Sequence, residues 1–326
     1  MDRINCPNTT ILFPGLTLDA FSGAPAAAPV PGILTLCHCI TGRIGWQLSE
    51  GQHVYLGPGD FAVYTANAAC QALPPQPDDI PQGMILRLDP AQFDAAPPPL
   101  LAGTGITGAG LTAKFGAGEA FLPLPGGSET AALFVGLAAG PGPLQAARQK
   151  LKALELLLYL SEMTPASQVP LTQYRAEQIA VIRQIHAQMI ENMAQRFTIE
   201  ALARQYLMNP TTLKEVFKSV YGTSIAAHIK EHRMQRAAEL LQMTSLSLAE
   251  IAQAVGYSSQ GKFTAAFKAY YQVPPKAFKK HPPDQSALPD CPCCKYRQSA
   301  RQKSLAEFAP RTAQIKSKSF SPAACG

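Results

Sequence analysis

The sequence predicts an α+β protein, in which a β-rich N-terminal domain precedes an all-α C-terminal domain with two helix-turn-helix units. Between residues 32 and 88, short apolar runs alternate with Gly, Pro and Asp clusters, which is typical of short strands and turns. Residues 199–272 contain one helix-turn-helix pattern twice. Charge divides between the same halves, because residues 1–170 hold 7 Lys and Arg against 12 Asp and Glu, whereas residues 171–326 hold 21 against 10.

The first domain, residues 1–142, is expected to be a small barrel or sandwich. Its apolar runs are ILTLCHCI, VYLGPGDFAVY and MILRL, and its high proline content leaves little room for long helices. A small barrel can hold one small ligand in its mouth or lumen. The side chains that we expect to line such a site are His38, Arg43, Trp46, His53 and Tyr64.

The histidines of this domain do not predict a metal site. His38 and His53 stand alone, without the paired histidines and the carboxylate of a metal-dependent enzyme, so we expect neither catalysis nor a cofactor. In a strand, Cys37 and Cys39 share one face and His38 points to the other. The two thiols either bind a soft metal or form a redox pair, or they are buried structural cysteines.

Residues 143–172 are expected to connect the two domains. Residues 144–163 predict a helix whose apolar surface is wider than a narrow stripe. Its leucines are Leu151, Leu154, Leu157, Leu158 and Leu160. Part of this surface should pack on the first domain, and the rest either completes the same core or pairs with a second copy of the helix. TPASQVP, residues 164–170, has the composition of a linker, and residues 173–195 predict the first helix of the second domain.

The repeat occupies residues 199–222 and 248–272 of the C-terminal domain, residues 173–281. Leu213, Phe217, Lys218 and Tyr221 correspond to Phe263, Phe267, Lys268 and Tyr271. The turn chemistry agrees, because Asn209 is a good N-cap and Pro210 suits the first helical position. In the second copy, Gly256 suits a left-handed C-cap, and Ser258 or Ser259 can cap the next helix.

Each second helix has a predicted buried face and a predicted exposed face. The buried faces are Leu213, Val216, Phe217 and Val220 in the first copy and Phe263, Ala266, Phe267 and Tyr270 in the second. The exposed residues are Thr211, Thr212, Lys214, Glu215, Lys218, Gln260, Lys262, Thr264 and Lys268. Their hydroxyl, amide and ammonium groups suit the base edges and phosphates of DNA, whereas the alternative is a solvated face of two helical hairpins. Gly261 and Ala265 offer no hydrogen-bonding side chain, so the first copy should carry more sequence specificity.

Residues 197–279 resemble the DNA-binding domain of the AraC/XylS family of transcription regulators. The resemblance includes both units, the connecting helix IAAHIKEHRMQRAAELLQ and the closing VPPKAF. It implies that the connecting helix, roughly residues 225–241, holds two recognition helices in successive major grooves. MNPTTLKEVFKSVYGTSI is most similar to the siderophore-responsive branch. Gln272 replaces the usual Gly, and Phe278 and Lys279 replace the common Tyr-Arg, which affects only the packing of the last turn.

The N-terminal runs resemble the cupin-like effector domain of the same family, so a cupin-like β-barrel is expected there. The whole resemblance implies a transcription regulator, with activation as the expected direction and repression as the alternative. Its implied partners are double-stranded DNA at promoter sites, a small-molecule effector such as an iron-siderophore, RNA polymerase and a second copy of the chain in a homodimer. The effector would act by changing the contact between the domains or between the two copies.

The last segment, residues 282–326, is polar and basic and is predicted to lack a fixed fold. Its Cys291, Cys293 and Cys294 could bind a soft metal ion, although the paired C-x-x-C spacing of a zinc site is missing. One rival function is therefore a thiol-based metal or redox sensor that uses Cys37 and Cys39 or this cluster. A second rival is a cupin enzyme with a DNA-binding appendage.

Length, charge and the distribution of apolar residues indicate the cellular compartment. The chain has 326 residues and a net charge of +6, without an apolar run of 18 residues or a signal-peptide core at its start. We expect a bacterial cytoplasmic protein with reduced thiols and no membrane contact.

Overall fold

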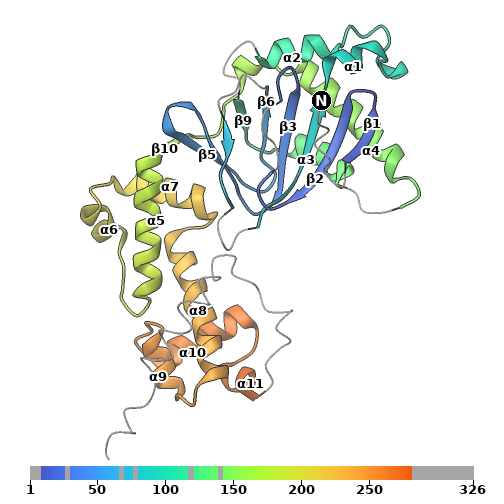
Figure 1. Cartoon of the computed structure of the whole chain (residues 1–326). Coiled ribbons are helices and arrows are strands. Elements are labelled where there is room, and N and C mark those ends of the chain that lie inside the picture. The colour runs from blue at the N-terminus through green and yellow to red at the C-terminus, as the bar shows by residue number, and fades with distance from the viewer. Residues whose placement is uncertain are drawn as a thin grey trace, which may run out of the picture.

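The computed structural model describes residues 9–25, 30–65, 70–75, 80–116, 121–138 and 142–280. A β-rich domain is followed by a helical domain, so the predicted mixed class is confirmed (Figure 1). The predicted tail, with Cys291, Cys293 and Cys294, lies outside the described residues.

The described strands form two antiparallel sheets. The larger has the order β1-β2-β8-β3-β6-β9 and the smaller has the order β10-β5-β4-β7. The larger sheet comprises β1 (Thr9–Phe13), β2 (Leu16–Ser22), β8 (Gln82–Leu88), β3 (Leu34–Thr41), β6 (Phe61–Tyr64) and β9 (Phe121–Leu124). The smaller comprises β10 (Tyr174–Arg175), β5 (Gln52–Leu56), β4 (Ile44–Gln47) and β7 (Gln71–Ala72).

The pairings among the described strands do not close a barrel. β1 and β9 remain the edges of the larger sheet, and β10 and β7 remain the edges of the smaller one. Barrel closure requires the two edge strands to pair. Pro123 in β9 lacks an amide donor and therefore suits an edge, and β1 lies next to the helix α4 (Gln145–Glu162). The expected cupin-like barrel is therefore not confirmed, because the described strands form two open sheets.

The larger sheet separates two cores. Leu34 and Leu36 of β3 pack with α1 (Pro90–Ala95), α2 (Gly108–Gly116), α3 (Ser128–Leu137) and α4. Cys37 and Cys39 belong to the other core, which lies between the sheets. His38 points to the helical side, where its ring stacks on Phe134 with 3.8 Å between centroids. The predicted division of these side chains between two faces is confirmed.

The helix predicted between the two domains is α4, and only part of its apolar surface is buried, as expected. Ala153, Leu154, Leu156, Leu157 and Leu160 are buried in the helical core. Leu151 and Leu158 are instead 62% and 38% exposed. The exposed pair lies seven residues apart, so the two side chains occupy one outward stripe of the helix.

The predicted first helix of the C-terminal domain begins later than expected. Tyr174 and Arg175 form β10, which pairs with His53 and Gln52 of β5, and α5 then runs over Ala176–Glu191. The chain therefore completes a sheet of the N-terminal domain before it enters the helical domain. Local helix periodicity cannot reveal this pairing, because the partner strand is more than a hundred residues away.

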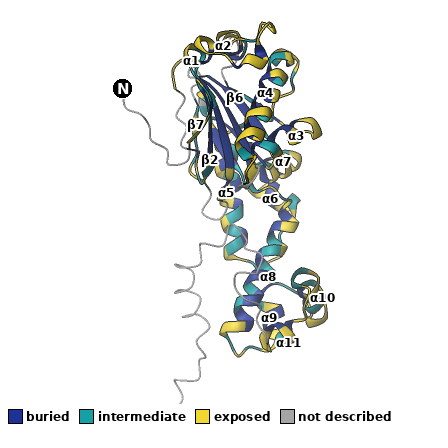
Figure 2. Cartoon of the chain, turned by 90° about the vertical axis from the view of Figure 1, so that its right-hand side faces the viewer, coloured by how far each residue is buried: buried dark blue, intermediate teal, exposed yellow. Residues whose placement is uncertain are grey.

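The helical domain has two cores bridged by one helix. Its other helices are α6 (Ile199–Gln205), α7 (Pro210–Tyr221), α8 (Ile225–Met243), α9 (Leu248–Ala254), α10 (Gln260–Tyr271) and α11 (Pro275–Lys280). The first core contains residues of α5, α6 and α7, and the second contains residues of α9, α10 and α11. Ile225 at the start of α8 lies in the first core, whereas Leu241 near its end lies in the second. Figure 2 shows α8 leading from the helices α5 and α6 to α9 and α10. The predicted helix between the two helix-turn-helix units is therefore confirmed as α8.

None of the described helices combines the length and apolarity that crossing a membrane would require.

Candidate nucleic-acid interface

The first recognition helix, α7, begins at the predicted cap. The side chain of Asn209 accepts a hydrogen bond from the amide of Thr211 at 2.8 Å, and Pro210 occupies the first turn. Gly222 ends the helix with a left-handed φ of +77°. Leu207, in the turn before α7, also has a left-handed φ, of +51°, although it is not glycine. The turn geometry thus overrides the ordinary preference of an L-residue.

The second recognition helix, α10, has the same construction. Ser259, rather than Ser258, provides the cap, because its hydroxyl accepts from the amide of Lys262 at 3.4 Å. Gly256 has the predicted left-handed φ, of +79°. A Cβ at Gly256 would lie 2.7 Å from the carbonyl oxygen of Met193, so this turn has no room for a side chain.

Both predicted buried faces are confirmed. Leu213, Val216, Phe217 and Val220 are buried in the first core. Phe263 and Phe267 are buried in the second core, whereas Ala266 and Tyr270 are partly buried against it. Phe278 is also buried there, with its ring centroid 5.2 Å from that of Phe267, so the departure from tyrosine keeps an aromatic contact.

The predicted DNA-contacting side chains lie on the surface of the domain. Thr211, Lys214, Glu215, Lys218, Gln260, Lys262 and Lys268 are exposed, and Thr212 and Thr264 are half-buried. Within the described part of the chain, none of the four lysines forms an ion pair. Their ammonium groups therefore face solvent, as phosphate contacts would require.

The N-terminal domain contacts the first helix-turn-helix unit. Arg43 donates a hydrogen bond to the carbonyl oxygen of Ser219 in α7. Tyr55 of β5 packs in the first core of the helical domain together with Ile179 and Val220. Burial and the positive charge of Arg183 on α5 lower the pKa of His53. Arg43 and His53, two predicted effector contacts, thus lie at the junction between the domains.

The other predicted effector residues lie elsewhere. Trp46 and Tyr64 are buried between the two sheets, with ring centroids 5.3 Å apart. Trp46 Nε1 and the Tyr64 hydroxyl are buried without a hydrogen-bond partner among the described residues. His38 lies across the sheet from them, and burial lowers its pKa to about 4. The structure therefore distributes the five residues over three places.

The thiols of β3 are poorly placed for sensing. Cys37 and Cys39 are fully buried, and burial raises the pKa of Cys37 far above its usual range. Cys39 Sγ donates to the carbonyl oxygens of Thr41 and Gly42 at 3.5 and 3.4 Å. Because the thiolate is the reactive form, this environment disfavours both metal binding and oxidation at these two residues.

Three histidines of the helical domain were not identified from the sequence. His186 of α5 meets His228 and His232 of α8, and one ring nitrogen from each lies within 4.8 Å of the other two. The spacing of four residues between His228 and His232 is the sequence signal that places two imidazoles on one helix face. The third histidine comes from a separate helix, so only the tertiary structure identifies the cluster.

Comparison with known proteins gives matches to the C-terminal part. Residues 202–281 match a family model described as a helix-turn-helix domain, and this range contains α7, α8, α9, α10 and α11. The HTH-type transcriptional regulator AlkR of Acinetobacter baylyi is 33% identical over 84 residues, which cover 26% of this chain and 28% of AlkR. The virulence regulon transcriptional activator VirF of Yersinia enterocolitica is 38% identical over 87 residues, which cover 27% of this chain and 32% of VirF.

The match spans about a third of the length of these curated relatives. Both are named as transcriptional regulators and neither is named as an enzyme. Among solved structures, the C-terminal domain of AraT, a response regulator from Geobacillus stearothermophilus, has 32% identity and a TM-score of 0.30, covering 31% of this chain and 84% of that one.

Proposed function

We propose that this chain, whose C-terminal part is an AraC-type helix-turn-helix domain, is a sequence-specific transcription regulator that binds promoter DNA. One observation carries the proposal: α7 and α10 are two capped helices of equivalent construction, joined by the single helix α8. Such an arrangement suits two successive major grooves on one face of a duplex. A regulator of this kind acts in the bacterial cytoplasm, where the promoters are.

The two recognition helices expose different numbers of side chains that can form hydrogen bonds with bases. α7 presents Thr211, Lys214 and Glu215, whose side chains can reach base edges. α10 presents Gly261 and Ala265 at comparable positions, with Lys262 and Lys268 beside them. We therefore assign most base recognition to α7 and mainly phosphate contacts to α10.

The effector site that we propose lies between the two sheets of the N-terminal domain. Trp46 Nε1 and the Tyr64 hydroxyl are buried there, and neither has a partner among the described residues. Each such atom costs about 1–3 kcal/mol when it stays unsatisfied, so a ligand with oxygen acceptors would recover this free energy. An iron-siderophore is the ligand class that the sequence of α7 favours.

The effector signal would reach DNA through the junction between the domains. β5 contributes Tyr55 to the core beneath α7 and pairs with β10, which continues directly into α5. Arg43 holds the C-terminal turn of the same recognition helix. A ligand that moves β4 or β5 therefore changes the position of α7, which couples the two sites.

The remaining proposed partners are a second copy and RNA polymerase. Leu144, Leu151 and Leu158 recur every seven residues and are 61%, 62% and 38% exposed, which suits a helix pair in a homodimer. RNA polymerase would contact the DNA-bound regulator in the course of activation.

The function is tested by mixing the purified full-length chain with sheared genomic DNA of its host and sequencing the retained fragments at increasing salt. We expect a motif with two half-sites about 10 base pairs apart. Retention that lacks a motif and disappears with salt, both with and without extracted host metabolites, would contradict specific recognition.

A further inference from the structure

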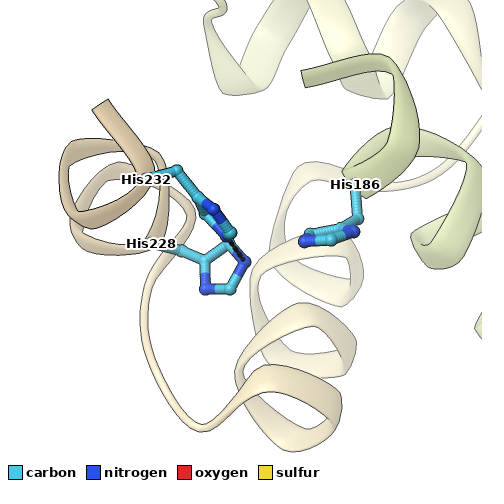
Figure 3. Close-up of side chains that lie close together, drawn as sticks. All are labelled: His186, His228 and His232. Atoms are coloured by element: carbon cyan, nitrogen blue, oxygen red, sulfur yellow. Dashed lines mark hydrogen bonds between the residues drawn. The ribbon is translucent and has the colours of Figure 1, made fainter. Parts of the chain in front are cut away.

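Three imidazoles converge inside the first helix-turn-helix unit. His228 and His232 lie on one face of α8, one turn apart, and His186 approaches them from α5 (Figure 3). Nε2 of His228 lies 3.0 Å from Nε2 of His232. One nitrogen from each of the three rings lies within 4.8 Å of the corresponding nitrogens of the other two. The side chains thus point to a common centre.

The packing around the cluster fixes the rings. His228 and His232 are 4% and 1% exposed, and His186 is half-buried. The His186 ring stacks on Tyr221 of α7 with 4.5 Å between centroids, and the rings of His228 and Phe217 meet in a T-shaped arrangement with 5.4 Å between centroids. Aromatic packing on these sides limits rotation of the imidazoles, so little side-chain conformational entropy is lost when a ligand binds.

We propose that His186, His228 and His232 bind a divalent transition-metal ion, with Zn²⁺ as the best fit. Zn–N bonds of ~2.0–2.1 Å in a tetrahedral site place the nitrogens about 3.3 Å apart. The present separations are 3.0 Å between Nε2 of His228 and Nε2 of His232 and no more than 4.8 Å across the cluster. Three neutral imidazoles suit Zn²⁺ and its neighbours in the series, whereas Mg²⁺ and Ca²⁺ prefer oxygen ligands. The half-buried side at His186 leaves the fourth position to water.

The site would join the parts of the domain that set its DNA-binding geometry. α5 packs on α7, the first recognition helix, and α8 leads from that unit to the second. A metal ion held by α5 and α8 would therefore fix the direction in which α8 leaves the first unit. Binding of the metal itself does not depend on the proposed function in transcription.

The test uses the full-length chain with Cys291, Cys293 and Cys294 replaced by Ser, so that tail thiolates cannot compete. After chelation, the protein is dialysed against Zn²⁺ or Co²⁺ and the bound metal is measured by elemental analysis. We expect one ion per chain, a higher Tm, and a visible Co²⁺ spectrum of tetrahedral nitrogen and oxygen ligands without thiolate charge transfer. Less than a tenth of an ion per chain in saturating metal would overturn the proposal.

Two substitutions at His186 separate a ligand from a packing residue. His186→Phe keeps a ring against Tyr221 and should weaken metal binding by about 100-fold or more. His38→Phe is the matched control, because His38 also stacks on an aromatic ring, and its binding should equal that of the parent. His186→Cys should still bind Co²⁺ and add thiolate charge-transfer absorption. Unchanged affinity in His186→Phe, or no charge transfer in His186→Cys, would show that the ion is held elsewhere.

Discussion

Arg43, in the turn between β3 and β4, donates a hydrogen bond from Nη1 to the carbonyl oxygen of Ser219 in α7 at 2.5 Å. The two residues are 176 positions apart. The same guanidinium lies beside Gly222, the left-handed cap of this helix. Carbonyl groups of a last helical turn carry the negative end of the helix dipole, so a cation is favourable there. The N-terminal domain thus holds the far end of the recognition helix and leaves Thr211 and Lys214 exposed.

The Arg43 contact should make the two domains unfold together. Arg43→Ala removes a charged donor and should destabilise the helical domain by about 1–2 kcal/mol. Trp46, the one tryptophan of the chain, reports the N-terminal domain by fluorescence, and far-ultraviolet circular dichroism reports the helices. We expect the two urea transitions to coincide in the parent and to separate in the variant. Arg148→Ala, at an exposed position on α4, is the control, and coincident transitions in both variants would contradict the coupling.

Lys214 should contribute to base recognition. Its side chain is exposed on the first turns of α7, the part of a recognition helix that reaches base edges. Lys214→Ala should weaken binding to the cognate site by ~1–3 kcal/mol and binding to random DNA by less, as measured by fluorescence anisotropy. Lys150→Ala, on α4 of the N-terminal domain, is the charge-matched control. Equal losses on both DNAs would reassign Lys214 to a phosphate.

The local architecture of the helical domain could be predicted from sequence, because its determinants are local. Asn209, Ser259 and Gly256 cap or end helices through contacts within a few residues, and all three have the predicted roles. The roles of Arg43 and His53 depend on long-range pairing of β5 with β10 and on contact with α7, which no local pattern encodes. The open sheets and the histidine cluster were missed for the same reason. The DNA-contacting and effector-binding roles themselves stay predictions.

The turns before the two recognition helices offer a matched pair of substitutions. Leu207 and Gly256 occupy corresponding positions, and both have left-handed φ angles, of +51° and +79°. Leu207 is 95% exposed, so Leu207→Gly removes strain without removing core contacts and should raise the free energy of unfolding by about 0.5–1 kcal/mol.

Gly256→Ala should have the opposite effect. The left-handed backbone costs about 1–2 kcal/mol for an L-residue, and the new Cβ would meet the Met193 carbonyl oxygen at 2.7 Å, which adds to that cost. Chemical denaturation of both variants at pH 7 measures the two changes. A loss of stability in Leu207→Gly, or no loss in Gly256→Ala, would show that the turns are not equivalent.

His38 should make the protein less stable as the pH falls. Burial against Phe134 lowers its pKa to about 4, and Nδ1 has no hydrogen-bond partner among the described residues. In the unfolded chain the pKa of histidine is ~6.5, so His38 becomes protonated as the pH falls below that value. In the folded chain His38 stays neutral until the pH approaches its lowered pKa of about 4. The contribution of neutral His38 to the free energy of unfolding is therefore complete well above pH 6.5 and is lost as the pH falls from about 6.5 to 4.

The size of this effect can be isolated with one substitution. Between pH 7 and pH 5, the difference in proton uptake at His38 should lower the free energy of unfolding by about 2 kcal/mol. His38→Phe keeps a ring against Phe134 but cannot titrate, so its loss of stability over this interval should be smaller by that amount. Between pH 8 and pH 9 His38 changes protonation in neither the folded nor the unfolded state, and the stability curves of parent and variant should run parallel there. Parallel curves down to pH 5 would mean that His38 is protonated within the folded domain, and its side of the sheet would then have to be open to water.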